Sequence, residues 1–139
     1  NINSNNNSSK YELPIYKVGD KGTKMIDADT LINLYSNDMS NNNNVKYVVI
    51  DCRFTYEYIT GHLDGGIHIQ DKYIINKLYE SNKNRNDNII IQWLFHCEYS
   101  QHRGPQIYKY FKNIDYQYNK NNYPYLSFPY VYIIYGGYQ

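Results

Sequence analysis

The sequence predicts an α/β fold in which a central, mostly parallel sheet is flanked by helices in three layers. Three apolar runs lack the alternation of a half-exposed strand, namely Val45–Asp51, Ile89–Phe95 and Tyr130–Tyr135, and Ile67–Ile69 is a fourth, shorter candidate. Helical patterns of about ten residues lie between these runs. Strands of this kind interleaved with helices are typical of a parallel sheet covered on both faces.

The predicted helices begin at recognisable residues. Asp27 is a favourable N-cap for a helix that ends near Tyr35, because its carboxylate can accept a hydrogen bond from the first turn. Lys72–Glu80 has one apolar face, as a helix packed on a sheet requires. Gly104–Ile114 is a third helix, with Pro105 in the first turn, where proline is tolerated.

Asparagine-rich tracts separate the patterned segments. Asparagine favours turns over helices and strands, because its side chain bonds the nearby main chain. We therefore expect loops in four tracts: Asn1–Ser9, Ser40–Asn44, Ser81–Asn88 and Asn119–Asn122. Residues 1–10 are expected to be a disordered Asn/Ser-rich leader, and residues 11–139 one domain, since 139 residues suit one core.

Charge and cysteine content exclude several classes of protein. The net charge is +1, from 14 basic and 13 acidic residues, and does not indicate a basic surface that binds nucleic acid or an anionic membrane. No apolar run reaches membrane-spanning length. The 2 cysteines form neither a disulfide framework nor a zinc motif, so we expect no metal, no cofactor and an intracellular location, in the cytoplasm or the nucleus. We also expect a monomer.

The segment from His96 to Pro105 has the pattern of an oxyanion-binding loop. Cys97 is followed after five residues by Arg103, between a predicted strand and a predicted helix. Backbone N–H groups of such a loop and the helix N-terminus can bind a phosphate and stabilise a thiolate. Cys97 is therefore the candidate nucleophile, and Arg103 the candidate residue that binds the phosphoryl oxygens. The loop residues are Glu98, Tyr99, Ser100, Gln101, His102 and Arg103.

This segment resembles the active-site loop of the M-phase inducer phosphatases, the cell-division-cycle dual-specificity phosphatases. Val49–Tyr58 with Gly61-His62 resembles the second signature of that family, and Asn122–Tyr138 resembles its third. The entry segment from Leu13 through the Asp27 helix is also similar. The resemblance implies the rhodanese-like three-layer fold and hydrolysis of phosphotyrosine, with phosphothreonine as an open second substrate, through a phosphocysteine.

The resemblance also implies roles for single residues. Cys52 of the Asp-Cys-Arg signature would trap the oxidised nucleophile as a disulfide, which would make it a redox-resolving residue. His102 stands where the family usually has glutamate, so the proton donor to the leaving group remains open between His102, Glu98 and a proton already on the phosphate. The implied partner is a phosphoprotein, with a cyclin-dependent kinase as the candidate. Lys112 and Tyr123 are compatible with the kinase-docking surface of the family, whereas Tyr116 replaces an arginine.

Two structural expectations accompany these assignments. Asp51, Arg53, Glu57 and His62 are expected to hold loops through hydrogen bonds and charge pairs, and Trp93 to pack in the core. The alternative functions are an arsenate reductase of the same fold, a thiosulfate sulfurtransferase and a non-catalytic rhodanese-like binding module.

Overall fold

The computed structural model describes residues 11–19, 22–36, 44–53, 55–85, 87–96 and 103–135. The expected leader over residues 1–10 therefore lies outside the described residues. The elements are β1 (Lys17–Val18), β2 (Lys24–Ile26), α2 (Ala28–Ser36), β3 (Val45–Asp51), α3 (Thr55–Thr60), β4 (Ile67–His68), α4 (Lys72–Lys83), β5 (Ile90–His96), α5 (Arg103–Tyr118), the 3₁₀ turn η2 (Lys120–Asn122) and β6 (Val131–Ile134).

The strands form one mostly parallel sheet in the order β1-β2-β6-β5-β3-β4. The pairs β2–β6, β6–β5, β5–β3 and β3–β4 are parallel, and β1 pairs with β2 in the antiparallel direction. The mostly parallel sheet predicted from the three apolar runs is confirmed. Its central strands have buried side chains on both faces, which explains why their sequences show no alternation.

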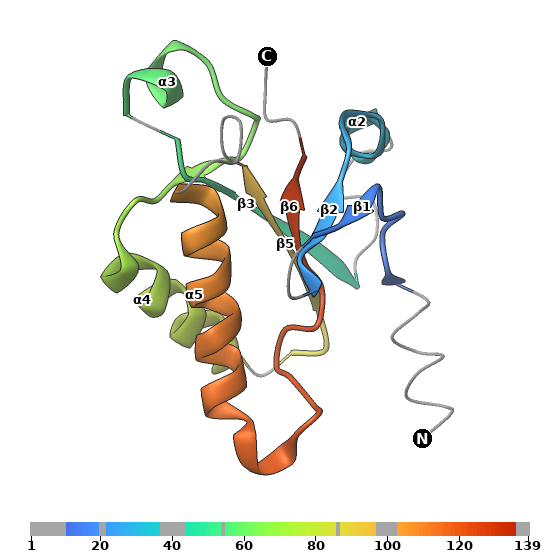
Figure 1. Ribbon diagram of the computed structural model, residues 1–139, viewed down its shortest axis with the longest axis vertical. Coiled ribbons are helices and arrows are strands. Elements are labelled where there is room, and N and C mark those ends of the chain that lie inside the picture. Colours follow the sequence, from blue (N-terminus) through green and yellow to red (C-terminus); the bar gives the residue numbers. More distant parts are fainter. Residues whose placement is uncertain are drawn as a thin grey trace.

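Helices cover both faces of this sheet. Figure 1 shows α4 and α5 together on one face and α2 on the other. Trp93, Phe95 and Phe111 are fully buried in the core between the sheet and the α4–α5 pair. Leu31 of α2 packs in a second core with Leu94 on the opposite face. The predicted core position of Trp93 is confirmed, with its ring 4.4 Å from that of Phe111.

Most of the predicted boundaries agree closely with the structure. Asp27 accepts a hydrogen bond from the Thr30 N–H group at 3.0 Å, as expected of an N-cap before α2. The predicted strand Val45–Asp51 is β3 without change, and the predicted strand at Ile89–Phe95 is displaced by one residue in β5.

Two helices are longer than predicted. The tract Ser81–Asn88 was expected to be a loop, but α4 continues through Lys83 and ends at Asn84, whose N–H group bonds the Glu80 carbonyl. The tract Asn119–Asn122 contains a 3₁₀ turn, and α5 continues to Tyr118. The extra turns of α4 and α5 contact each other. The Tyr118 ring stacks on that of Tyr79 at 5.4 Å, and the Lys83 ammonium lies 4.9 Å from the centre of the Tyr118 ring. These contacts outweigh the weak turn preference of asparagine.

A buried carboxylate holds the end of α5 against the segment that leads into β6. Asp115 is 2% exposed and accepts hydrogen bonds from the Tyr79 hydroxyl at 2.7 Å and from the Ser127 and Phe128 N–H groups at 3.0 and 2.9 Å. Burial, together with the hydrogen bond to Asp115, raises the pKa of Tyr79 above its ordinary range. The hydroxyl therefore stays protonated and donates to the carboxylate.

Replacing Tyr79 with phenylalanine is expected to lower the free energy of unfolding by about 1–3 kcal/mol, because Asp115 loses a buried donor. Urea denaturation measures this change. Tyr118→Phe is the matched control, since the Tyr118 hydroxyl donates to Glu80 on the surface and the side chain is 51% exposed. An equal loss of stability in both variants would contradict a special role for the buried hydrogen bond.

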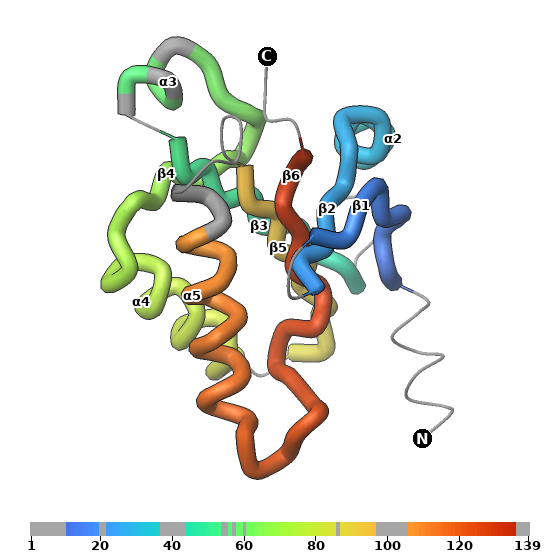
Figure 2. Tube along the Cα trace, viewed as in Figure 1, coloured from blue at the N-terminus to red at the C-terminus, as the bar shows by residue number. Residues whose placement is uncertain are grey.

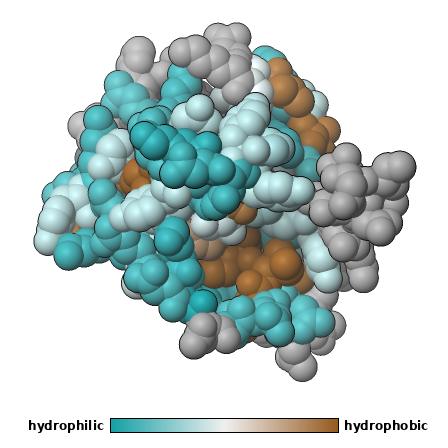
Figure 3. Space-filling view, turned by 90° about the horizontal axis from the view of Figure 1, so that it is seen from below, coloured by the Kyte–Doolittle hydropathy of each residue, from teal (hydrophilic) through white to brown (hydrophobic). Residues whose placement is uncertain are grey.

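The surface of the domain is mixed. Seen from below, it is mainly hydrophilic, with separate hydrophobic areas between the polar ones (Figure 3). None of the helices in the described part of the chain is long and apolar enough to cross a membrane.

Candidate active site

The predicted polar residues lie at the carboxyl edge of the sheet. Asp51 at the end of β3 is the register partner of His96 at the end of β5, and His96 is also paired with Ile134 of β6. The Cys52 N–H group donates a hydrogen bond to the His96 carbonyl at 2.8 Å. The chain therefore leaves β5 towards Cys97 from a position held on both sides by neighbouring strands.

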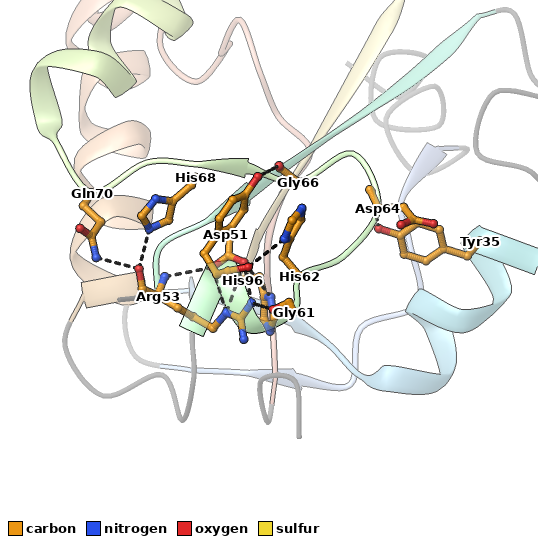
Figure 4. A network of polar contacts seen from close by, with 11 residues as sticks. Tyr35, Asp51, Arg53, Gly61, His62, Asp64, Gly66, His68, Gln70 and His96 are labelled. Atoms are coloured by element: carbon orange, nitrogen blue, oxygen red, sulfur yellow. Dashed lines mark hydrogen bonds and ion pairs between the residues drawn. The ribbon is translucent and has the colours of Figure 1, made fainter. Parts of the chain in front are cut away.

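A buried ion pair lies directly beside His96. Arg53 donates from Nε to Asp51 Oδ1 at 3.0 Å and from Nη2 to Asp51 Oδ2 at 2.9 Å. Both side chains are almost completely buried, with 4% of Arg53 and 1% of Asp51 exposed. The His96 Nδ1 atom is 3.8 Å from Asp51 Oδ2, and Figure 4 shows the three side chains grouped together. A bidentate arginine–carboxylate pair has a fixed geometry, so it can orient its neighbours.

The main chain of Arg53 connects this pair to the turn before α4. The Arg53 carbonyl accepts hydrogen bonds from His68 Nε2 at 2.9 Å and from Gln70 Nε2 at 2.7 Å (Figure 4). Because a carbonyl can only accept, the His68 ring carries its proton on Nε2 in this arrangement. These contacts connect the ends of β3 and β4.

Aromatic stacking attaches α3 to the same edge. The Tyr58 ring lies between the rings of His62 and His68, with centroid distances of 3.9 and 4.7 Å. The Tyr58 hydroxyl donates to the Gly66 carbonyl at 2.9 Å, and Arg53 Nη2 donates to the Gly61 carbonyl. Figure 2 shows α3 at the end of the molecule where α5 begins.

Four residues, Asp51, Arg53, Glu57 and His62, are expected from the sequence to hold loops, and the structure describes the side chains of three of them. Asp51, Arg53 and His62 hold loops through hydrogen bonds or charge pairs, and His62 does so through a 2.9 Å contact between its Nδ1 atom and the Tyr58 carbonyl. The predicted role of these three is confirmed, whereas the side chain of Glu57 lies outside the described residues.

A pocket of about 310 Å³ opens beside this network. Its described lining is Cys52, Gln70, Lys72, Gln106 and Ile107, which come from the ends of β3 and β4 and from the first turns of α4 and α5. Cys52 is 1% exposed. The side of this pocket formed by Ile107 and Cys52 is continuous with the core between the sheet and α5.

Most of the predicted catalytic segment lies outside the described residues. This holds for Cys97, Glu98, Tyr99, Ser100, Gln101 and His102, and for the side chain of Arg103. The structure does place both ends of the segment, at His96 and at the start of α5 on Arg103. The assignments of these residues, and of Cys52 as the redox-resolving residue, stay predictions.

Sequence reasoning missed several residues of this edge. Tyr58, His68, Gln70 and Lys72 were not singled out, although all contribute to the network or the pocket. The available signal was their position, because His68 lies in the short run Ile67–Ile69, Gln70 directly follows it, and the carboxyl ends of parallel strands meet at one edge. Within the described part of the chain, no group of three or more His, Cys, Asp or Glu residues could hold a metal ion.

Comparison with known proteins supports the expected fold and family. The family model described as rhodanese-like domain matches residues 34–139. An M-phase inducer phosphatase of Schizosaccharomyces pombe is 35% identical over 91% of this chain and 21% of its own length. Those of Drosophila melanogaster and Emericella nidulans are 32% and 40% identical, over 95% and 81% of this chain and 29% and 19% of their own lengths. The chain thus spans less than a third of these relatives.

Two solved structures have the same fold. An As-Sb reductase from Leishmania major superposes with a TM-score of 0.62 at 24% identity, covering 82% of this chain and 72% of the other. A yeast protein tyrosine phosphatase of the rhodanese family gives 0.59 at 21% identity, covering 81% and 79%. Likeness at this level of identity shows the fold alone, so the reductase does not favour the arsenate alternative.

Proposed function

The chain belongs to the rhodanese-like domain family, and on that premise we propose that it is a cysteine-dependent protein phosphatase that hydrolyses phosphotyrosine through a phosphocysteine intermediate. The observation that carries the proposal is the position of His96. It ends a central strand beside a buried ion pair, and the seven residues from Cys97 to Arg103 lead from it into the N-terminus of α5. Identity of 32–40% to three M-phase inducer phosphatases supports the same activity.

The proposed reaction has two displacement steps. The Cys97 thiolate attacks phosphorus, the bond between phosphorus and the tyrosine oxygen breaks, and the phenolate leaves and takes up a proton. Water then attacks the phosphocysteine, the S–P bond breaks, and inorganic phosphate and the thiolate are released. Phosphothreonine is a second substrate in this proposal, although its alkoxide is a poorer leaving group that needs more help from a proton donor.

Electrostatic stabilisation is assigned to the loop and to Arg103. The backbone N–H groups of Glu98 to His102 would surround the phosphoryl oxygens, and the N-terminus of α5 adds a positive partial charge. The planar guanidinium of Arg103 can bind two of these oxygens while charge shifts during the reaction. For the proton delivered to the leaving group, His102, Glu98 and the phosphate itself remain the three candidates.

We assign Cys52 the role of a resolving thiol. Its N–H group bonds the carbonyl of His96, the residue immediately before Cys97. A peroxide would oxidise the Cys97 thiolate to a sulfenic acid, and the Cys52 thiol would then displace water to form a disulfide. The oxidised nucleophile would thereby be protected from further, irreversible oxidation.

The proposed substrate is a phosphoprotein, with a cyclin-dependent kinase as the specific candidate. Tyr123 is 71% exposed and its ring lies 6.0 Å from that of Tyr116, so an aromatic surface is available beyond the end of α5. Lys112 lies one helical turn before Tyr116 and is partly buried, and burial lowers its pKa. This surface is the candidate for contact with the protein substrate.

Hydrolysis of an aryl phosphate under reducing conditions tests the proposed activity. We expect phosphate release that is inhibited by vanadate, and we expect vanadate to protect Cys97 from alkylation. If no phosphate is released and vanadate does not protect Cys97 from alkylation, a non-catalytic binding module is favoured. Glutathione-dependent production of arsenite with negligible phosphate release would favour an arsenate reductase instead.

A further inference from the structure

The charge on the described lining of the pocket beside the candidate active site comes from one lysine. Among its described lining residues, Lys72 is the charged one, and Gln70 and Gln106 add neutral amides. The ion pair behind the pocket has no net charge, because Arg53 and Asp51 neutralise each other. The described part of the rim is therefore positive.

Neighbouring contacts hold Lys72 in place. It is the first residue of α4, and the preceding residue, Asp71, is the N-cap. The Asp71 carboxylate is the nearest acid along the chain, and it accepts a hydrogen bond from the Tyr73 N–H group at 2.8 Å. The Lys72 ammonium lies 5.3 Å from the centre of the Tyr110 ring on α5, a cation–π distance. The charge is thus attached to two helices rather than to a flexible loop.

The amide groups are also positioned. Gln70 donates to the Arg53 carbonyl at 2.7 Å, so its side chain is fixed against the end of β3. Gln106 is three residues after Arg103 in α5, which corresponds to about 4.5 Å along the helix axis. The pocket therefore begins within one helical turn of the residue assigned to bind phosphate, close enough for the residue next to a phosphotyrosine to reach it.

We propose that this pocket binds an acidic side chain adjacent to the phosphotyrosine and that Lys72 is the residue that determines this specificity. The inference rests on the proposed phosphatase function and adds to it a substrate class, namely phosphopeptides with Asp or Glu beside the phosphorylated residue. Lys72 attracts the carboxylate, while the two glutamine amides can donate hydrogen bonds to it. A basic neighbour is disfavoured by like-charge repulsion.

Two phosphotyrosine peptides that differ in the flanking residues, acidic in one and alanine in the other, test the inference. We expect kcat/KM to be about twofold to fivefold higher for the acidic peptide with the parent chain, since an exposed charge pair contributes no more than that. Lys72→Gln should remove the preference and Lys72→Glu should reverse it. Raising the salt concentration should weaken the preference of the parent chain.

Lys77→Glu is the matched control. Lys77 lies on the same helix as Lys72, and Lys77→Glu changes the net charge by the same amount as Lys72→Glu. Lys77, however, lines a separate pocket with Tyr73, Asn76 and Glu80. This variant should keep the preference of the parent chain. An equal effect of Lys77→Glu would indicate a general charge effect and overturn the inference.

The other outcomes are also decisive. If the parent chain hydrolyses an aryl phosphate but treats both peptides alike, the inference is overturned and the proposed function stands. If the parent chain hydrolyses neither the aryl phosphate nor the peptides, the proposed function fails and the inference fails with it.

Discussion

Replacing Cys97 with serine is expected to lower kcat/KM for an aryl phosphate by about 10³-fold or more, because removing a nucleophile removes the covalent step of the reaction. A serine hydroxyl stays protonated at neutral pH, whereas a thiol next to backbone N–H groups and a helix N-terminus is readily ionised. The measurement is steady-state phosphate release under reducing conditions.

Two observations separate lost chemistry from lost structure in the Cys97→Ser variant. Its free energy of unfolding, measured by urea denaturation, should equal that of the parent chain. Vanadate should still bind it, because the backbone N–H groups and Arg103 remain. A variant as active as the parent chain would refute the assignment of Cys97 as nucleophile.

Replacing Asp51 with asparagine is expected to destabilise the protein by about 3–5 kcal/mol, since removing one partner of a buried ion pair leaves an uncompensated charge in the core. Here the remaining charge is Arg53, of which 4% is exposed. The free energy of unfolding is measured by urea denaturation at neutral pH.

The surface pair between Arg85 and Asp87 is the matched control. Asp87 is 43% exposed and accepts a hydrogen bond from Arg85 Nε at 3.0 Å. Asp87→Asn removes the same kind of charge, but water solvates the arginine that remains, so the midpoint of denaturation should not move. If Asp51→Asn lowered the free energy of unfolding as little as Asp87→Asn, the buried pair would not stabilise the edge of the sheet as we describe.

Local sequence patterns predicted the elements that make the sheet. Val45–Asp51 is mainly β-branched and apolar, and five of its seven side chains are buried, so its position inside the sheet follows from composition. Asp27 predicted the start of α2 because N-capping depends on neighbouring residues alone. The same locality explains why the strand at β5 was displaced by only one residue.

Elements that depend on distant partners were missed. β1 and β2 are 2 and 3 residues long and exist because β2 pairs with β6, more than a hundred positions later. The helix α3 is held by stacking of Tyr58 on His62 and His68 and by Arg53, which its six residues do not reveal. The extension of α4 through Lys83 similarly depends on the contact of Lys83 with the Tyr118 ring of α5.

The sequence by itself determined the fold class, the family and the identity of the candidate catalytic residues. The spacing from Cys97 to Arg103 and the apolar strand before it are local features, and local chemistry is sufficient to indicate an oxyanion loop. The tertiary structure decided which side chains lie at the edge of the sheet where β5 ends. It paired Asp51 with Arg53 beside His96, and it brought Lys72 and Gln106 from different helices to one pocket. The position of His96 beside Asp51 depends on the pairing of β5 with β3, and the pocket depends on the packing of α4 and α5 on the sheet, so both join residues far apart in the chain.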